Sequence, residues 1–200
     1  VLTKFSSLHF VATEKSAQNL IDYGIKRETV YNYGCPAVEY ITKLAVGDIF
    51  NAAHISKKFK HPIHVTNDEK YFLVMVHPDT TNKHDVDMDK VLEAVSSFGF
   101  KTFIFYPNID AHNAEIVSSI AKYSTNDNFF MIRHMPLQDF VHTMAHCVCM
   151  IGNSSSGIRE SASFGIPFIN IGDRQIGRER NKNTIDIGDD YDSLEATIKM

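Results

Sequence analysis

The chain has 200 residues, of which 44% are hydrophobic and 22% are charged, and these values are typical of a globular protein of one domain or slightly more. Its formal net charge of −4 provides no general attraction to nucleic acid or to an anionic membrane, although a local basic patch stays open. The longest apolar runs, such as residues 71–76, are too short to cross a bilayer. We therefore expect neither nucleic acid nor a membrane as a partner.

The sequence shows no signal peptide and begins at Val1 in the middle of a pattern, so we expect a piece of a longer protein. It contains three cysteines, and Cys147 and Cys149 flank Val148 within one apolar run. In a strand their side chains would point to the same face of a sheet. We predict buried, reduced thiols, which suit a cytoplasmic protein.

Apolar, β-branched and aromatic runs alternate with helix-length segments along the chain. Strands are predicted at residues 8–12, 30–33, 71–76, 102–106, 128–132, 147–151, 167–171 and 184–187. Helices are predicted at residues 14–23, 37–44, 86–98, 111–123, 137–146, 155–164 and 193–199. Continuous apolar strands between helices favour an α/β fold in which a parallel sheet is covered on both faces.

Residues 46–69 break this alternation, because they are polar, rich in histidine and lysine, and contain Pro62. We predict a linker there. Residues 1–45 would then be the end of a preceding domain with its hinge, and residues 70–200 would form the regular parallel domain.

Polar residues follow five successive predicted strands of the chain. In an open parallel sheet the ligand lies outside the carboxyl ends of the strands. We therefore expect a binding site at this edge. The residues at these strand ends are His77, Asn108, Arg133, Ser154, Ser155, Ser156 and Arg174.

The stretch GNSSSGIRE has two glycines, Gly152 and Gly157, at the spacing of a Walker-type phosphate loop. Ile158 and Arg159 stand where that loop needs Lys and Ser or Thr, so the stretch does not resemble a nucleoside triphosphatase site. We predict that a helix starting near Ser155 presents free N–H groups to an anion. An ordinary helix N-cap is the simpler alternative.

Glu160 lies one turn into this predicted helix, where it would repel a phosphate unless another group lay between them. A ribose diol would fit, because a carboxylate accepts both hydroxyl hydrogens. A solvated glutamate near a helix start is the alternative. Pyrophosphate at the serines and ribose at Glu160 would together describe a nucleoside diphosphate. Arg174 would supply compensating charge, unless it lies on the surface.

Two histidine pairs, His61/His64 and His142/His146, have a helix-compatible metal spacing. No cysteine or carboxylate stands at a matching offset, so we predict solvated or core histidines. The sequence predicts neither a metal site nor a cofactor.

The stretches GCP, HPDTT, PNID, GNSSSGIRE and FGIPFINIGDRQIGRE, in this order, resemble those of the hydrolysing UDP-N-acetylglucosamine 2-epimerases. The resemblance spans nearly the whole chain and is most specific in residues 152–179. Non-hydrolysing relatives usually carry an aspartate-serine-glycine-glycine pattern in place of the three serines. The resemblance implies a GT-B-like architecture of two Rossmann-like domains. This chain would hold the end of the first domain and the UDP-binding second domain.

The resemblance also implies roles for individual residues. Ser154, Ser155 and Glu160 would hold the diphosphate and the ribose, and Met135 and its neighbours would line the uracil. His77 would act in catalysis as an acid/base or as a diphosphate contact, unless it only packs at its strand end. Further residues that would contact UDP or face the cleft are Asn108, Arg133, Ser156, Gly157 and Arg174.

The implied reaction converts UDP-N-acetylglucosamine and water to N-acetylmannosamine and UDP, the first step of sialic acid biosynthesis. A base removes the C2 proton, UDP leaves by anti elimination to give a glycal, and water adds. The principal carboxylates would come from the first domain, so we expect this chain alone to be inactive. A homo-oligomer is compatible with the sequence.

Two alternatives from other classes stay open. One is the donor-nucleotide-binding half of a GT-B glycosyltransferase, and the other is a non-enzymatic nucleotide-binding module. An epimerase would release free sugar without an acceptor, which a transferase would not. Bacterial relatives also act on 2,4-diacetamido sugars, so the sugar itself is open.

Overall fold

The computed structural model of the chain describes residues 2–45, 69–79, 86–188 and 191–200. The chain divides into two compact units, Val1–Lys43 and Leu44–Met200. The predicted linker at residues 46–69 lies outside the described residues except for its last position.

The first unit is built around two short parallel strands, β1 and β2. Thr13 caps the main helix of this unit, because its side chain accepts a hydrogen bond from the backbone N–H of Ser16. The sequence pattern predicts both strands and the longer helices, but a single helical turn carries no periodicity and is missed. The elements are α1 (Leu2–Phe5), β1 (His9–Val11), α2 (Glu14–Asp22), a 3-10 turn (Arg27–Thr29), β2 (Val30–Asn32) and α3 (Pro36–Ala45), which crosses the unit boundary.

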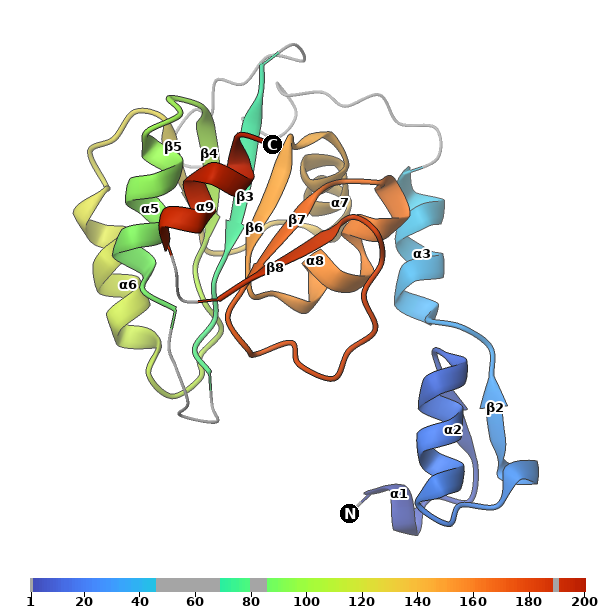
Figure 1. Cartoon of the computed structure of the whole chain (residues 1–200). Coiled ribbons are helices and arrows are strands. Elements are labelled where there is room, and N and C mark those ends of the chain that lie inside the picture. Colours follow the sequence, from blue (N-terminus) through green and yellow to red (C-terminus); the bar gives the residue numbers. More distant parts are fainter. Residues whose placement is uncertain (1, 46–68, 80–85, 189–190) are drawn as a thin grey trace. The chain divides into compact units, whose positions relative to one another are not determined.

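The second unit is a six-stranded parallel sheet with the order β5-β4-β3-β6-β7-β8, which can be followed from left to right in Figure 1. The predicted parallel α/β fold is confirmed. Its elements are β3 (Tyr71–Met75), α5 (Met88–Ser96), β4 (Lys101–Phe105), α6 (Asn113–Lys122), β5 (Phe129–Ile132), α7 (Leu137–His146), β6 (Cys149–Gly152), α8 (Ser155–Arg159), a 3-10 turn (Ser161–Phe164), β7 (Phe168–Ile171), β8 (Thr184–Ile187) and α9 (Tyr191–Ile198).

The order of the strands creates a switch point between β3 and β6. From β3 the chain moves outward through β4 and β5, and it then returns to the other side of β3 to add β6, β7 and β8. Connections that leave in opposite directions open a crevice at the carboxyl ends of the two central strands. The fold therefore places a binding position between the ends of β3 and β6.

Side chains alternate between the two faces of the sheet, and both faces are covered. Phe72 and Val74 of β3 belong to the apolar core that includes residues of α5, α6 and α9. Tyr71, one step along the same strand, faces α7 and donates its hydroxyl to the carbonyl oxygen of Thr143 at 2.8 Å. The sheet is thus buried on both sides, which explains why its strands read as continuous apolar runs.

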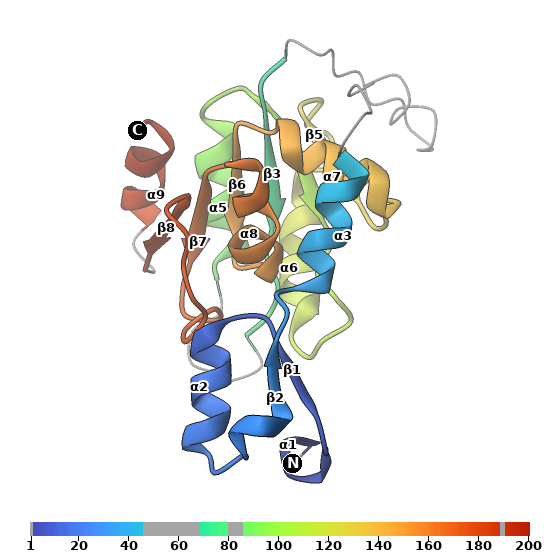
Figure 2. The ribbon, with the colours of Figure 1, turned by 90° about the vertical axis from the view of Figure 1, so that its right-hand side faces the viewer.

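Two glycines of residues 152–157, the segment with three consecutive serines that we call the serine loop, are required by close packing. Gly152 has φ +137°, and a Cβ there would lie 2.0 Å from the carbonyl oxygen of Met75 on the neighbouring strand. A Cβ on Gly157 would lie 2.3 Å from the buried ring of Phe168. Figure 2 shows α8 next to β6 and β7, with which it packs. The two glycines allow β6 to approach β3 and α8 to approach β7.

The helix predicted at residues 155–164 is shorter than expected. The α-helix α8 ends at Arg159, and a 3-10 turn, Ser161–Phe164, continues to Gly165, which has φ 67°. The hydroxyl of Ser161 donates to the carbonyl oxygen of Gly157 at 2.7 Å. Such back-bonding by serine, together with a left-handed glycine, is typical of a tightened helix end. The prediction of one continuous α-helix is wrong at this point.

Cys147 and Cys149 are buried, with 4% and 7% of their surface exposed, and neither forms a disulfide. The prediction that both lie in one strand is wrong. Cys147 caps α7 and its thiol donates to the carbonyl oxygen of Met144 at 3.2 Å, whereas β6 begins at Cys149. Burial raises the pKa of both thiols, that of Cys149 to about 12.

We expect a thiol reagent at neutral pH to label Cys35 much faster than Cys147 or Cys149 in the native protein. Cys35 is partly exposed, whereas the other two thiols are buried and remain protonated. The measurement is labelling followed by mass spectrometry, with Cys35→Ser as the background variant. Rapid labelling of both buried positions in that variant would contradict the structure.

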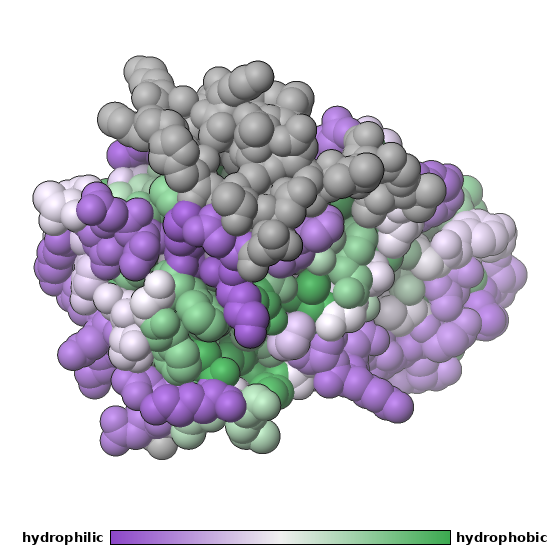
Figure 3. Space-filling model, turned by 90° about the horizontal axis from the view of Figure 1, so that it is seen from above, coloured by the Kyte–Doolittle hydropathy of each residue, from purple (hydrophilic) through white to green (hydrophobic). Residues whose placement is uncertain are grey.

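None of the described helices has the length and apolar character needed to cross a bilayer. In Figure 3 hydrophilic side chains cover much of the surface, and apolar side chains show between them.

Candidate nucleotide site

The polar residues predicted at strand ends lie along one edge of the sheet. Because the strands are parallel and their order is known, these residues follow one another across the edge. From β5 to β7 the order is Arg133, Asn108, His77, Ser154 and Arg174. The residues after β3 and β6, His77 and Ser154, stand at the switch point itself.

His77 is buried at this switch point, with 6% of its surface exposed. Its ring nitrogen Nδ1 accepts a long hydrogen bond of 3.4 Å from the backbone N–H of Asn108. Burial, reinforced by the nearby Arg174 guanidinium and opposed by Asp110, lowers the pKa of His77 to about 4. The imidazole is therefore neutral at pH 7, and acceptance at Nδ1 assigns its proton to Nε2.

We expect the ring of His77 to titrate near the lowered pKa of about 4, rather than at the ordinary value of about 6.5. As the pH falls below about 6.5 the unfolded chain takes up this proton before the folded chain does. The contribution of His77 to the free energy of unfolding is therefore full above that pH and decreases toward about pH 4. NMR titration measures the pKa, with His77→Gln to assign the resonance, and a midpoint near the ordinary value would contradict the burial.

The serine loop follows β6 directly. Ser154 is buried and is the N-cap of α8, and its side chain accepts a hydrogen bond of 3.4 Å from the backbone N–H of Ser156. Ser155 and Ser156 are partly exposed. The capping role that the sequence left open is thus present at Ser154, and two further hydroxyl groups next to it remain accessible. Because α8 has only five residues, hydroxyl and backbone donors matter more here than a helix dipole.

Glu160 is buried at the end of α8, with 9% of its surface exposed. Its oxygen Oε1 accepts a hydrogen bond from Arg159 at 3.0 Å, while Oε2 is buried and has no hydrogen-bond partner among the described residues. A buried carboxylate oxygen without a donor is costly. The geometry therefore offers an acceptor that a ligand hydroxyl group could satisfy.

Arg174 and Gln175 reach the serine loop from the segment that follows β7. The guanidinium of Arg174 donates to the carbonyl oxygen of Asn153 at 3.1 Å, and the amide of Gln175 donates to the same oxygen at 2.7 Å. Arg180 holds this segment in place, because it donates to the Gln175 carbonyl oxygen at 2.8 Å and pairs with Asp186 at 3.1 Å. A cation is thus fixed beside the serines.

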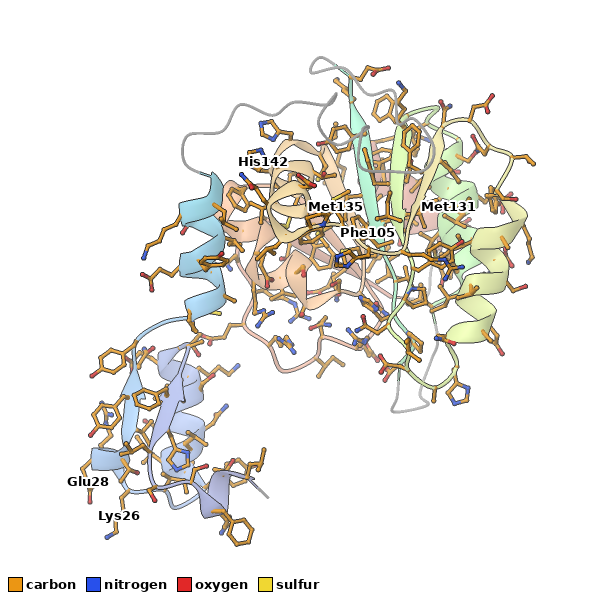
Figure 4. The ribbon with its side chains drawn as sticks, turned by 180° about the vertical axis from the view of Figure 1, so that it is seen from behind. Lys26, Glu28, Phe105, Met131, Met135 and His142 are labelled. Atoms are coloured by element: carbon orange, nitrogen blue, oxygen red, sulfur yellow. The ribbon has the colours of Figure 1, made fainter. Side chains whose placement is uncertain are left out.

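Arg133 and Met135 are not joined to this cluster by any described hydrogen bond. The exposed guanidinium of Arg133 lies over the ring of Tyr106, 4.2 Å from its centroid. The side chain of Met135 is buried and its sulfur accepts a hydrogen bond from Thr143 of α7 at 3.5 Å. Figure 4 shows Met135 and Phe105 near each other on the side of the sheet where α7 lies. For a ligand, Met135 therefore offers mainly its backbone.

The family profile of UDP-N-acetylglucosamine 2-epimerases matches residues 1–200. The chain belongs to this family. The family resemblance inferred from the motifs is therefore confirmed.

Several relatives in the epimerase family cover the whole chain or nearly so. A UDP-N,N'-diacetylbacillosamine 2-epimerase (hydrolyzing) of Legionella pneumophila is 32% identical over 99% of the chain and 51% of its own length. The polysialic acid biosynthesis protein P7 of Escherichia coli is 30% identical over 100% of the chain and 50% of its own length. The chain therefore spans about half the length of these relatives.

Solved structures of epimerases share the fold. A UDP-GlcNAc 2-epimerase from Neisseria meningitidis bound to UDP-GlcNAc superposes with a TM-score of 0.76 at 18% sequence identity. The superposition covers 98% of this chain and 53% of the Neisseria chain. The UDP-GlcNAc 2-epimerase from Methanocaldococcus jannaschii in complex with UDP-GlcNAc and UDP gives a TM-score of 0.70 at 15% sequence identity. This superposition covers 97% of this chain and 54% of the Methanocaldococcus chain. The Rossmann-like, GT-B-type fold class expected for an epimerase is confirmed.

Some residues of this cluster at the sheet edge are not predicted from the sequence. Asn153, Gln175 and Arg180 build the cluster, yet only the position of Asn153, directly after a strand and a glycine, carries a local signal. No group of three His, Cys, Asp or Glu residues able to hold a metal occurs among the described residues. His61 and His64 lie outside them.

Proposed function

We propose that the chain is the UDP-binding half of a hydrolysing UDP-N-acetylglucosamine 2-epimerase that serves sialic acid biosynthesis. The observation that carries the proposal is the convergence of His77, Arg174 and the serine loop at the switch point, one helical turn from the buried carboxylate of Glu160. The names of the relatives support the epimerase chemistry and, through the hydrolyzing and polysialic acid proteins, its finer type.

In the proposed site the diphosphate of UDP lies against the serine hydroxyls and Arg174. The guanidinium is charged at all physiological pH values and matches the oxygens of a phosphate. Ser155 and Ser156 are accessible donors beside it. Asn108 and Gly157 contribute at the margins, the first through the loop after β4 and the second by letting α8 lie close to β7.

The uridine lies beyond the diphosphate, between Glu160 and the end of β5. The ribose hydroxyls donate to the unpartnered Oε2 of Glu160 and remove an unsatisfied buried acceptor. The backbone at Met135 supplies hydrogen bonds to the uracil, and the exposed Arg133, stacked on Tyr106, borders the base.

Anti elimination of UDP from C1 develops negative charge on the leaving diphosphate, and fixed donors stabilise that charge. Arg174 is held by the carbonyl oxygen of Asn153, and neutral His77 presents a proton at Nε2. A neutral imidazole whose Nδ1 already accepts a hydrogen bond is a better donor to phosphate than a base. We therefore assign His77 to the diphosphate rather than to proton abstraction from C2.

The remaining parts of the proposal concern the whole protein. The free thiols Cys35, Cys147 and Cys149 agree with a reducing compartment, and we place the protein in the cytoplasm. The proposed elimination and hydration are acid/base steps assisted by hydrogen-bonding groups. Its ligands are UDP-N-acetylglucosamine and UDP.

The first test is binding by the 200-residue chain. We expect UDP to bind more tightly than UMP, because only the diphosphate reaches both the serine loop and Arg174. Each charge-assisted hydrogen bond to the second phosphate contributes about 1.5–3 kcal/mol. Calorimetric titration of both nucleotides measures the difference, and equal affinities would rule out the diphosphate assignment.

The hydrolysing type is tested separately on the protein at the full length of its relatives. It is incubated with UDP-N-acetylglucosamine without any acceptor, and the products are identified by NMR. Free N-acetylmannosamine with UDP supports the hydrolysing reaction. Release of UDP-N-acetylmannosamine would contradict the proposal and indicate a non-hydrolysing epimerase. No reaction until an acceptor is added would indicate a glycosyltransferase.

A further inference from the structure

Asn153 joins the two strands that meet at the switch point. Its side-chain Oδ1 accepts from the backbone N–H of His77 at 2.8 Å, and its Nδ2 donates to the carbonyl oxygen of His77 at 2.8 Å. Its own backbone N–H donates to the carbonyl oxygen of Met75 at 3.1 Å. Only 1% of Asn153 is exposed, so these bonds are shielded from water.

The backbone of Asn153 also holds the neighbouring cation. Its carbonyl oxygen accepts from Arg174 at 3.1 Å and from Gln175 at 2.7 Å, which uses both lone pairs. One residue therefore fixes His77 through its side chain and Arg174 through its main chain. His77 follows β3 and Arg174 follows β7, so neither contact can be recognised from a local sequence pattern.

The amide side chain satisfies the backbone of His77 because it both donates and accepts. An ionised carboxylate accepts but does not donate, and an alanine leaves a buried N–H and a buried C=O without partners. We propose that Asn153 is a positioning residue that sets the imidazole of His77 and the guanidinium of Arg174 at the separation needed to hold a diphosphate between them. This role rests on the proposed function, but the geometry it describes exists without a ligand.

The test compares Asn153→Ala and Asn153→Asp with the unsubstituted chain. In Asn153→Ala we expect the NMR titration midpoint of His77 to rise from about 4 toward its ordinary value, because the ring is no longer held in its buried place beside Arg174. We expect the dissociation constant for UDP to rise at least about tenfold, as one good hydrogen bond in the site is lost.

Asn153→Asp supplies a readout that a merely structural role would not produce. A buried carboxyl group takes up a proton well above its usual pKa, and the protonated form donates and accepts like the amide. UDP affinity of Asn153→Asp, expressed relative to the unsubstituted chain at the same pH, should therefore recover as the pH falls from about 8 to about 5. The ratio cancels the ionisation of UDP itself.

Asn183→Asp is the matched control. Asn183 also donates from its amide to two partners, Ser161 and the carbonyl oxygen of Ile166, but it precedes β8, and no hydrogen bond between it and His77 is described. We expect Asn183→Asp to lose stability without a change in the His77 titration.

An Asn153→Ala protein with unchanged His77 titration and UDP affinity would overturn the proposal, as would an Asn153→Asp protein that matches Asn153→Ala at every pH. If Asn153→Ala does not fold, Asn153→Asp decides alone. If the unsubstituted chain does not bind UDP, the proposed function fails, and the ligand-free titration of His77 still decides the role of Asn153.

Discussion

Glu160→Gln is expected to weaken UDP binding by about 1.5–3 kcal/mol, a factor of roughly 10 to 150 in the dissociation constant. In the proposed site both ribose hydroxyls donate to this carboxylate. One of its oxygens already accepts from Arg159 and the other has no described partner, so an amide cannot replace it without presenting an N–H to a donor. Calorimetric titration should show the same loss for UMP as for UDP, because the two nucleotides share the ribose.

Glu195→Gln provides the matched control for this experiment. Glu195 lies on α9, where it pairs with Lys199 at 3.4 Å, and 43% of its side chain and 65% of that of Lys199 are exposed. The change removes the same charge without touching the sheet edge, so nucleotide affinity should stay unchanged. If Glu160→Gln binds both nucleotides as tightly as the control does, the ribose lies elsewhere and Glu160 is an ordinary helix-terminal carboxylate.

The main elements of the fold could be predicted because they depend on local periodicity. The helix predicted at 137–146 is found as α7 with the same limits, and the apolar runs become the strands of a sheet that is buried on both faces. The predictions are wrong where tertiary contacts decide the conformation. Residues 160–164 leave the α-helix because Ser161 bonds back to Gly157 and Gly165 closes the turn.

The candidate site was predictable to the extent that parallel topology collects strand ends at one edge. His77, Ser154 and Arg174 follow different strands and lie near one another for that reason alone. The hydrogen bonds that fix them were not predictable, since the amide of Asn153 meets a backbone 76 residues earlier in the chain. The inward direction of the Met135 side chain likewise depends on its contact with α7.

The 200-residue chain alone is expected to convert UDP-N-acetylglucosamine orders of magnitude more slowly than a protein with the full length of its relatives, because a base and correct positioning each contribute large factors. Removal of the C2 proton needs a basic group of the protein next to C2 of the bound sugar. Asp79 is buried and makes an interaction within the chain, and Asp110 lies in the turn before α6, where its backbone carbonyl oxygen accepts from the N–H of Asn113. His77 is neutral, with Nδ1 occupied.

The measurement follows UDP and N-acetylmannosamine by NMR during incubation of the chain with UDP-N-acetylglucosamine. UDP binding to the same sample is the control, because it shows that absence of turnover comes from a missing base and not from an unfolded site. Asp110→Asn should leave the small residual rate unchanged, since its carboxylate is assigned no role. Turnover comparable to that of the full-length protein would contradict the expectation. The base would then lie within this chain, and loss of activity in Asp79→Asn, Asp110→Asn or His77→Gln would identify it.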